Sequence, residues 1–173
     1  MDASNIIYLW IPSLILIVAA VDDLKTRKIH NWLVGTCFLV ATVSVTLVYG
    51  WQGFTSGFVA SSLALALTLP LVLVKALGAG DMKIMLAFAM VSQWQIVFWV
   101  IVYALMWGAI LGLIKAFIDK RGLLLLRNTF FIATRKLSAS DPGMTKIPFS
   151  IALIFGWLTQ LTLNSGAGDI GLW

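Results

Sequence analysis

The feature of this sequence that most constrains its fold is a succession of long apolar runs that contain almost no charge. The first run covers residues 6–21 and the last covers residues 148–163. A helix of about 20 apolar residues spans the roughly 30 Å hydrocarbon core of a bilayer. No run alternates apolar and polar residues as the strands of a membrane barrel do. The pattern therefore predicts an all-α integral membrane protein.

The composition excludes an ordinary soluble domain. Charged residues make up 11% of the 173 residues, whereas a soluble domain carries about 25%. The net charge of +5 does not indicate nucleic acid, because the basic residues lie in breaks between apolar runs, so we expect membrane lipid as the partner and no nucleic acid. Residues 1–5 hold an acid and no base, so the first run is expected to be a permanent span and not a signal peptide.

The placement of lysine and arginine predicts the topology. All twelve fall within residues 22–28, 75–83 and 115–146, whereas the breaks at residues 49–53 and 92–95 hold no charge. Basic loops remain cytoplasmic, so this alternation predicts six transmembrane helices with both termini outside, in a single membrane domain of residues 1–173. The predicted spans cover residues 6–21, 32–49, 54–74, 82–93, 96–115 and 147–164.

One predicted span is short. The chain must go out and back within the 31 residues between Lys83 and Lys115, although two full helices and a turn need about 40 residues. We therefore expect a short helix at residues 82–93, completed by neighbouring helices or water. The basic segment 116–146 is expected on the cytoplasmic side, either as an amphipathic helix on anionic lipid or as a flap over the site.

Two acidic motifs carry the candidate chemistry. They are DDLKTRKIHN at residues 22–31 and GAGDMK at residues 78–83, and both are predicted at cytoplasmic ends of helices. Asp23 and Asp81 are thus expected at the same depth, where they can meet. Two facing carboxylates share one proton. The ionised group can take a proton from an attacking water, while the protonated group donates to the developing oxyanion, which is the chemistry of an aspartic peptidase.

Other catalytic devices are scarce in this chain. It has no glutamate, one cysteine (Cys37) and one histidine (His30), so we expect no metal site and no cofactor. Cys37 lies in an apolar run and is expected to pack there. A second Gly-x-Gly-Asp pattern, at residues 166–169, follows the last apolar run, so Asp169 is expected in a polar tail on the outer face.

The two motifs together resemble the type IV prepilin peptidases and their archaeal preflagellin relatives, which are membrane aspartic peptidases of the GxGD type. That family has an Asp-Leu-basic stretch leading into Ile-Pro-Asn, and then Gly-x-Gly-Asp followed closely by lysine. Residues 23–31 follow the first pattern with His30 in the place of proline, and residues 78–83 match the second in full. Ile-Pro-Phe at residues 147–149 is similar to the family's sequence before the last span, so the resemblance covers nearly the whole chain.

The resemblance implies roles for individual residues. Asp23 and Asp81 would form the catalytic pair, and Asp22 would then balance Lys25 and Arg27. The residues that would shape the substrate site are Asn31, Gly78, Gly80 and Lys83. Glycine beside the catalytic aspartate lets a substrate strand approach the backbone closely.

The resemblance also implies a substrate and a location. Such enzymes sit in the prokaryotic cytoplasmic (inner) membrane as multi-pass proteins. They cut the short basic leader from pilin-like or flagellin-like precursors on the cytoplasmic side, just before an apolar stretch. The chain looks like the short form without a cysteine-rich domain, so N-methyltransferase activity is not expected.

Simpler interpretations of the same residues stay open. Asp23 would serve only as a partner of headgroup-level bases, Asp81 only as a helix N-cap, and Lys83 only as a topology anchor. His30 would be either an interfacial polar residue or a group that takes part in catalysis. For the whole chain the alternatives are a small ion-coupled transporter, with ionisable residues near the membrane midplane, or a non-enzymatic scaffold of a pilus or secretion assembly.

Overall fold

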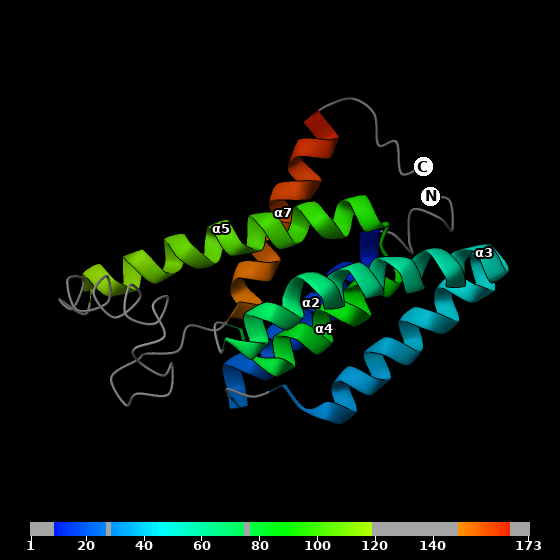
Figure 1. Ribbon diagram of the computed structural model, residues 1–173, viewed down its shortest axis with the longest axis horizontal. Coiled ribbons are helices and arrows are strands. Elements are labelled where there is room, and N and C mark those ends of the chain that lie inside the picture. Colours follow the sequence, from blue (N-terminus) through cyan, green and yellow to red (C-terminus); the bar gives the residue numbers. More distant parts are fainter. Residues whose placement is uncertain (1–8, 27–28, 75–76, 119–148, 167–173) are drawn as a thin grey trace.

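The computed structural model describes residues 9–26, 29–74, 77–118 and 149–166, and within these ranges the chain is helical and forms no strand (Figure 1). The helices are α2 (Ile11–Thr26), α3 (Asn31–Leu73), α4 (Ala79–Met90), α5 (Trp94–Ile118) and α7 (Phe149–Gly166). The prediction of an all-α protein is confirmed for these residues. The predicted basic segment 116–146 lies almost wholly outside them, as do Arg27 and Asp169.

Helix α3 is a hairpin of two arms. Its 43 residues would measure about 65 Å if straight, but Gly50 adopts φ 60° and ψ −147° and reverses the chain. Glycine reaches this conformation without the penalty that a Cβ would add. Figure 1 shows the two arms diverging from this turn. The first arm, residues 31–49, and the second arm, residues 51–73, meet inside the uncharged break at residues 49–53.

Helix α4 is the short helix that follows the GAGD motif, and it lies at the centre of the core. Its 12 residues rise about 18 Å. Its buried residues are Ile84, Met85, Ala87, Phe88, Ala89 and Met90, each at most 2% exposed. The second arm of α3 approaches α4 closely because Gly57 lies against the backbone carbonyl of Met90, where a Cβ would overlap it. Neighbouring helices therefore bury the side chains of this short helix.

Helices α2 and α7 run antiparallel, and two long-range hydrogen bonds join them. The Ser150 hydroxyl donates to Asp23 Oδ2 at 2.6 Å, and the Trp157 ring nitrogen donates to Ser13 Oγ at 2.8 Å. On another face, α7 packs on α5 through Gly156, where a Cβ would lie 2.8 Å from the Val100 carbonyl oxygen. The position of α7 along α2 is thus fixed near both ends of α2, through the first half of α7.

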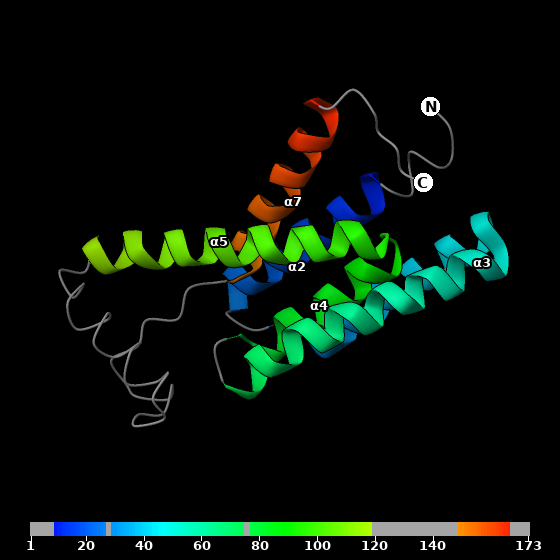
Figure 2. The ribbon, with the colours of Figure 1, turned by 45° about the horizontal axis from the view of Figure 1, so that its top comes forward.

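One end of the bundle collects the segments that carry the sequence motifs. The C-terminal end of α2 and the N-terminal ends of α3, α4 and α7 lie there, and the Gly50 turn lies at the opposite end (Figures 1 and 2). Helix α2 continues to Thr26, five residues beyond the predicted end of the first span at residue 21. Asp22 and Asp23 therefore sit in the last turns of a helix, and the predicted charged loop begins later than expected.

The surface of the bundle is suited to lipid. Asn31–Leu73 and Trp94–Ile114 are long and apolar enough to cross a membrane, and Phe149–Asn164 is apolar but shorter. Large apolar side chains stand outward, including Trp32, Leu47, Trp51 and Leu73, which are 69–80% exposed. Outward hydroxyls such as Thr42 and Ser62 bond to carbonyls of the preceding helical turn, as groups without water must do. The number of crossings and the sides of the termini stay predictions.

Candidate active site

Asp23 lies near the C-terminal end of α2 and faces α7. Its Oδ2 accepts the hydrogen bond from Ser150, whose side chain is buried in the first turn of α7. The 2.6 Å separation is typical of a hydroxyl donating to an ionised carboxylate. This bond leaves Asp23 Oδ1 available for other partners.

Asp22 turns to a different partner, although it is adjacent to Asp23. Its Oδ2 accepts the His30 backbone N–H at 3.0 Å, and the His30 ring nitrogen Nδ1 lies 2.9 Å from the same oxygen. The His30 N–H, followed by its ring, holds the pKa of the Asp22 carboxyl below its usual 3.8. Lys25 adds only a weaker electrostatic effect. The sequence predicted Lys25 and Arg27 as the balancing charges, but Lys25 is secondary to His30, and Arg27 is outside the described residues.

His30 therefore has a structural task that the sequence did not reveal. It is the N-cap residue of α3 and makes no side-chain bond to its own helix. Its backbone N–H and ring both reach back to Asp22 and close the connection between α2 and α3. A proline has no N–H to donate. His30 instead closes this connection through its hydrogen bonds to Asp22, which we call the clasp.

Asp81 is the third residue of α4 and not its N-cap, which is Gly78. The Asp81 carboxylate accepts the backbone N–H of Gly78, as an acid at this position of a capping box does. A Cβ on Gly78 would lie 2.8 Å from Asp81 Oδ2, so the glycine makes room for the carboxylate to fold back over the helix start. Asp81 Oδ1 is buried and has no hydrogen-bond partner among the described residues.

The two sequence motifs are in direct contact. A Cβ on Gly80 would lie 3.1 Å from the Cβ of Ile29, so the start of α4 packs on the residue before His30. The Lys83 ammonium group donates to Asn31 Oδ1 at 2.8 Å. Lys83 thus does more than anchor the topology, because it ties α4 to the start of α3.

Asp23 and Asp81 meet at this end of the bundle, near enough for the Asp23 carboxylate to act electrostatically on Asp81. The structure therefore groups all the residues predicted for the site. They are Asp23, Asn31, Gly78, Gly80, Asp81 and Lys83. Among the described residues no group of three histidine, cysteine or acidic side chains could hold a metal ion. The arrangement brings two carboxylates from different helices within electrostatic reach of each other.

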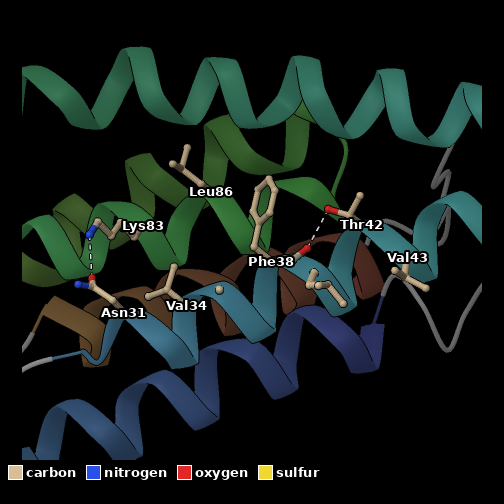
Figure 3. A pocket seen from close by; sticks show the side chains of 9 residues that line it. Asn31, Val34, Phe38, Thr42, Val43, Lys83 and Leu86 are labelled. Atoms are coloured by element: carbon tan, nitrogen blue, oxygen red, sulfur yellow. Dashed lines mark hydrogen bonds between the residues drawn. The ribbon is translucent and has the colours of Figure 1, made fainter.

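A groove of about 660 Å³ opens between the first arm of α3 and α4 (Figure 3). Asn31 and Lys83 form its polar end, and their hydrogen bond is visible in Figure 3. The rest of its lining is largely apolar and includes Phe38 and Leu86. Gly35 also lines it, and a Cβ there would meet nothing within 4 Å. Sequence reasoning did not predict this groove.

Comparison with known proteins gives one match. The sequence profile of the type IV leader peptidase family matches residues 10–113, from the start of α2 through most of α5. The matched range contains both acidic motifs and excludes Ser150. A search of curated proteins and a search of solved structures each returned no match.

Proposed function

Because the chain belongs to the type IV leader peptidase family, we propose that it is a membrane-embedded aspartic endopeptidase that removes the leader of pilin-like or flagellin-like precursors. The family supports a protease role, and the two long apolar helices support a membrane protein. The observation that carries the finer proposal is that Asp23, near the end of α2, lies within electrostatic reach of Asp81, at the start of α4. No other pair of described acidic residues in different helices is grouped in this way.

The pair supports a mechanism that uses one bound water. Asp23 takes a proton from the water while the water oxygen attacks the scissile carbonyl carbon. Asp81 donates its proton to the carbonyl oxygen. In the second step the C–N bond breaks as the amine nitrogen takes the proton from Asp23. Asp81 recovers its proton from the hydroxyl of the tetrahedral intermediate as the new carboxyl group forms. No covalent enzyme intermediate is needed.

The distribution of basic residues supports a site on the cytoplasmic side of a prokaryotic inner membrane. Lys25 lies in the last turn of α2 and Lys83 near the start of α4, as the two acids do, whereas the break at the Gly50 turn carries no charge. Basic segments remain cytoplasmic. Counting the two arms of α3 separately gives six crossings of the membrane, with both termini outside.

The groove supports the same substrate class. Its polar end is formed by Asn31 and Lys83, at the end of the bundle that carries the acidic pair, and it continues between apolar side chains of α3 and α4. A leader cut just before an apolar stretch requires that stretch to lie beside the acidic pair while it remains within the lipid. We assign the groove to the apolar segment of the precursor. An ion-coupled carrier would place its ionisable groups near the midplane, whereas Asp23 and Asp81 lie at helix ends.

The test is cleavage of a candidate precursor by the purified protein in detergent. Asp23→Asn and Asp81→Asn are each expected to lower kcat by about 1000-fold or more, because each removes an ionisable member of the pair. Asp22→Asn is the matched control, since it makes the same chemical change at the neighbouring residue that His30 holds, and it is expected to keep most of the activity. Normal cleavage by either variant of the pair would overturn the proposal.

A further inference from the structure

We propose that Ser150 is a positioning residue that holds Asp23 as the base of the pair and thereby leaves Asp81 as the acid, an inference that rests on the peptidase function proposed above. Ser150 lies in α7, outside the range that the family profile matches. The sequence gives no local signal for such a role, because a serine in the first turn of a helix ordinarily caps its own backbone.

The contact is a built one. Ser150 is only 3% exposed, and its hydroxyl donates a hydrogen bond of 2.6 Å to Asp23 Oδ2. This bond joins α7 to α2. A hydroxyl that donates to a carboxylate stabilises its ionised form. It also fixes the rotation of the side chain, so that Oδ1 is the oxygen left to receive a proton from water.

Asp81 has the opposite surroundings. One of its oxygens, Oδ1, is buried and finds no donor among the described residues. Leaving an ionised oxygen buried without a donor is costly, and a proton on Asp81 removes that cost. The two carboxyl groups of the pair are therefore unlike, because Asp23 accepts the Ser150 hydroxyl whereas Asp81 has a buried oxygen without a donor among the described residues.

The rest of α7 keeps Ser150 at this position. Trp157 donates to Ser13 of α2 at 2.8 Å, two turns further along the interface. Gly156 allows α7 to lie directly on the backbone of α5. Ser150 and Trp157 are thus two separate attachments of α7 to α2, and only Ser150 touches the acidic pair.

The ionisable surroundings of Asp23 are simple. Asp81 faces it from α4, and its neighbours along α2 are Asp22, which His30 holds at the start of α3, and Lys25. The described part of α7 carries no ionisable side chain. A change in the ionisation of Asp23 after mutation of Ser150 can therefore be read without a second titrating group on α7.

The experiment compares Ser150→Ala, Ser150→Cys and Ser150→Thr in the full chain, with kcat and KM for a precursor peptide measured across pH. Ser150→Ala removes the hydroxyl that donates to the Asp23 carboxylate, so we expect the acid limb of the kcat profile to move upward by about one pH unit. We also expect kcat to fall by about 10-fold at the acid side while KM stays unchanged. Ser150→Cys keeps the volume but is a weak donor and should show the same shift, whereas Ser150→Thr should restore the original profile.

Ser13→Ala is the matched control, because it removes the other hydroxyl of the α2–α7 interface and is expected to keep the original pH profile. If Ser150→Ala does not fold, Ser150→Cys decides. An unshifted acid limb in the folded variants overturns the positioning role. Asp23→Asn and Asp81→Asn in the same assay show whether the positioning role alone fails or the proposed function fails as well. If both aspartate variants are inactive while the serine variants keep the original pH profile, only the positioning role is rejected.

Discussion

Replacing Gly78 by alanine tests the site without touching either aspartate. A Cβ at this position would lie 2.8 Å from Asp81 Oδ2 and 3.7 Å from its Cγ, and ordinary contacts begin at 3.4 Å. The carboxylate must move away by several tenths of an ångström, since the backbone of the helix start is the less mobile partner. A misplacement of about 1 Å at a catalytic group costs about 100-fold in rate, so we expect Gly78→Ala to lower kcat by roughly 10- to 100-fold.

The same substitution should scarcely alter stability. Gly78 has φ −73° and ψ 140°, which alanine adopts freely. Alanine is a poorer N-cap by about 0.5 kcal/mol, and the lower entropy of its unfolded chain offsets about as much. The free energy of unfolding should therefore change by less than about 1 kcal/mol.

Gly57→Ala provides the crossed comparison. Its Cβ would overlap the Met90 backbone carbonyl, which cannot rotate away, so a loss of about 1–3 kcal/mol in stability is expected. The assay is kcat for a precursor peptide together with thermal unfolding followed by circular dichroism. If Gly78→Ala keeps the wild-type kcat, or loses as much stability as Gly57→Ala, the description of Asp81 folded over Gly78 is wrong.

Two further predictions concern the groove and the clasp. Gly35→Leu places a side chain in the open space of the groove, so KM for a full precursor should rise. The kcat, and the cleavage of a short peptide without the apolar stretch, should stay nearly constant. An unchanged KM would contradict the proposal that the groove holds the apolar segment of the precursor. The lowered pKa of Asp22 means that its contribution to stability is present above its unfolded pKa near 3.8 and is lost as the pH falls through its lower folded pKa. Thermal unfolding measured from about pH 5 to pH 2 should show a smaller acid loss in Asp22→Asn, and equal losses would count against the clasp.

Much of the architecture follows from local pattern. Apolar runs predict helices, the uncharged break at residues 49–53 predicts a turn between two spans, and the spacing from Lys83 to Lys115 predicts a short α4. Placing basic breaks on one side of a membrane also brings Asp23 and Asp81 to one end, because helix ends on the same side share a depth. These inferences need only periodicity and charge.

The finer site could not be predicted, because its contacts depend on long-range register. The contact of Ser150 with Asp23 depends on the position of α7, which the contacts of Trp157 and Gly156 help to hold. His30 donates a hydrogen bond to Asp22 because α2 continues to Thr26 and directs that carboxylate toward the start of α3. Counting nearby charges favoured Lys25 instead, since sequence proximity does not show in which direction a helical side chain points.

The central claim is that Asp23 and Asp81 are neighbours, and thiol cross-linking in native membranes tests it most directly. In a Cys37→Ala background, Asp23→Cys combined with Asp81→Cys should form an intramolecular adduct with a short thiol-specific cross-linker. Trp51→Cys combined with Asp81→Cys should not, because residue 51 lies by the turn at the opposite end of the bundle. Absence of the first adduct, or equal yields from the two pairs, would contradict the account.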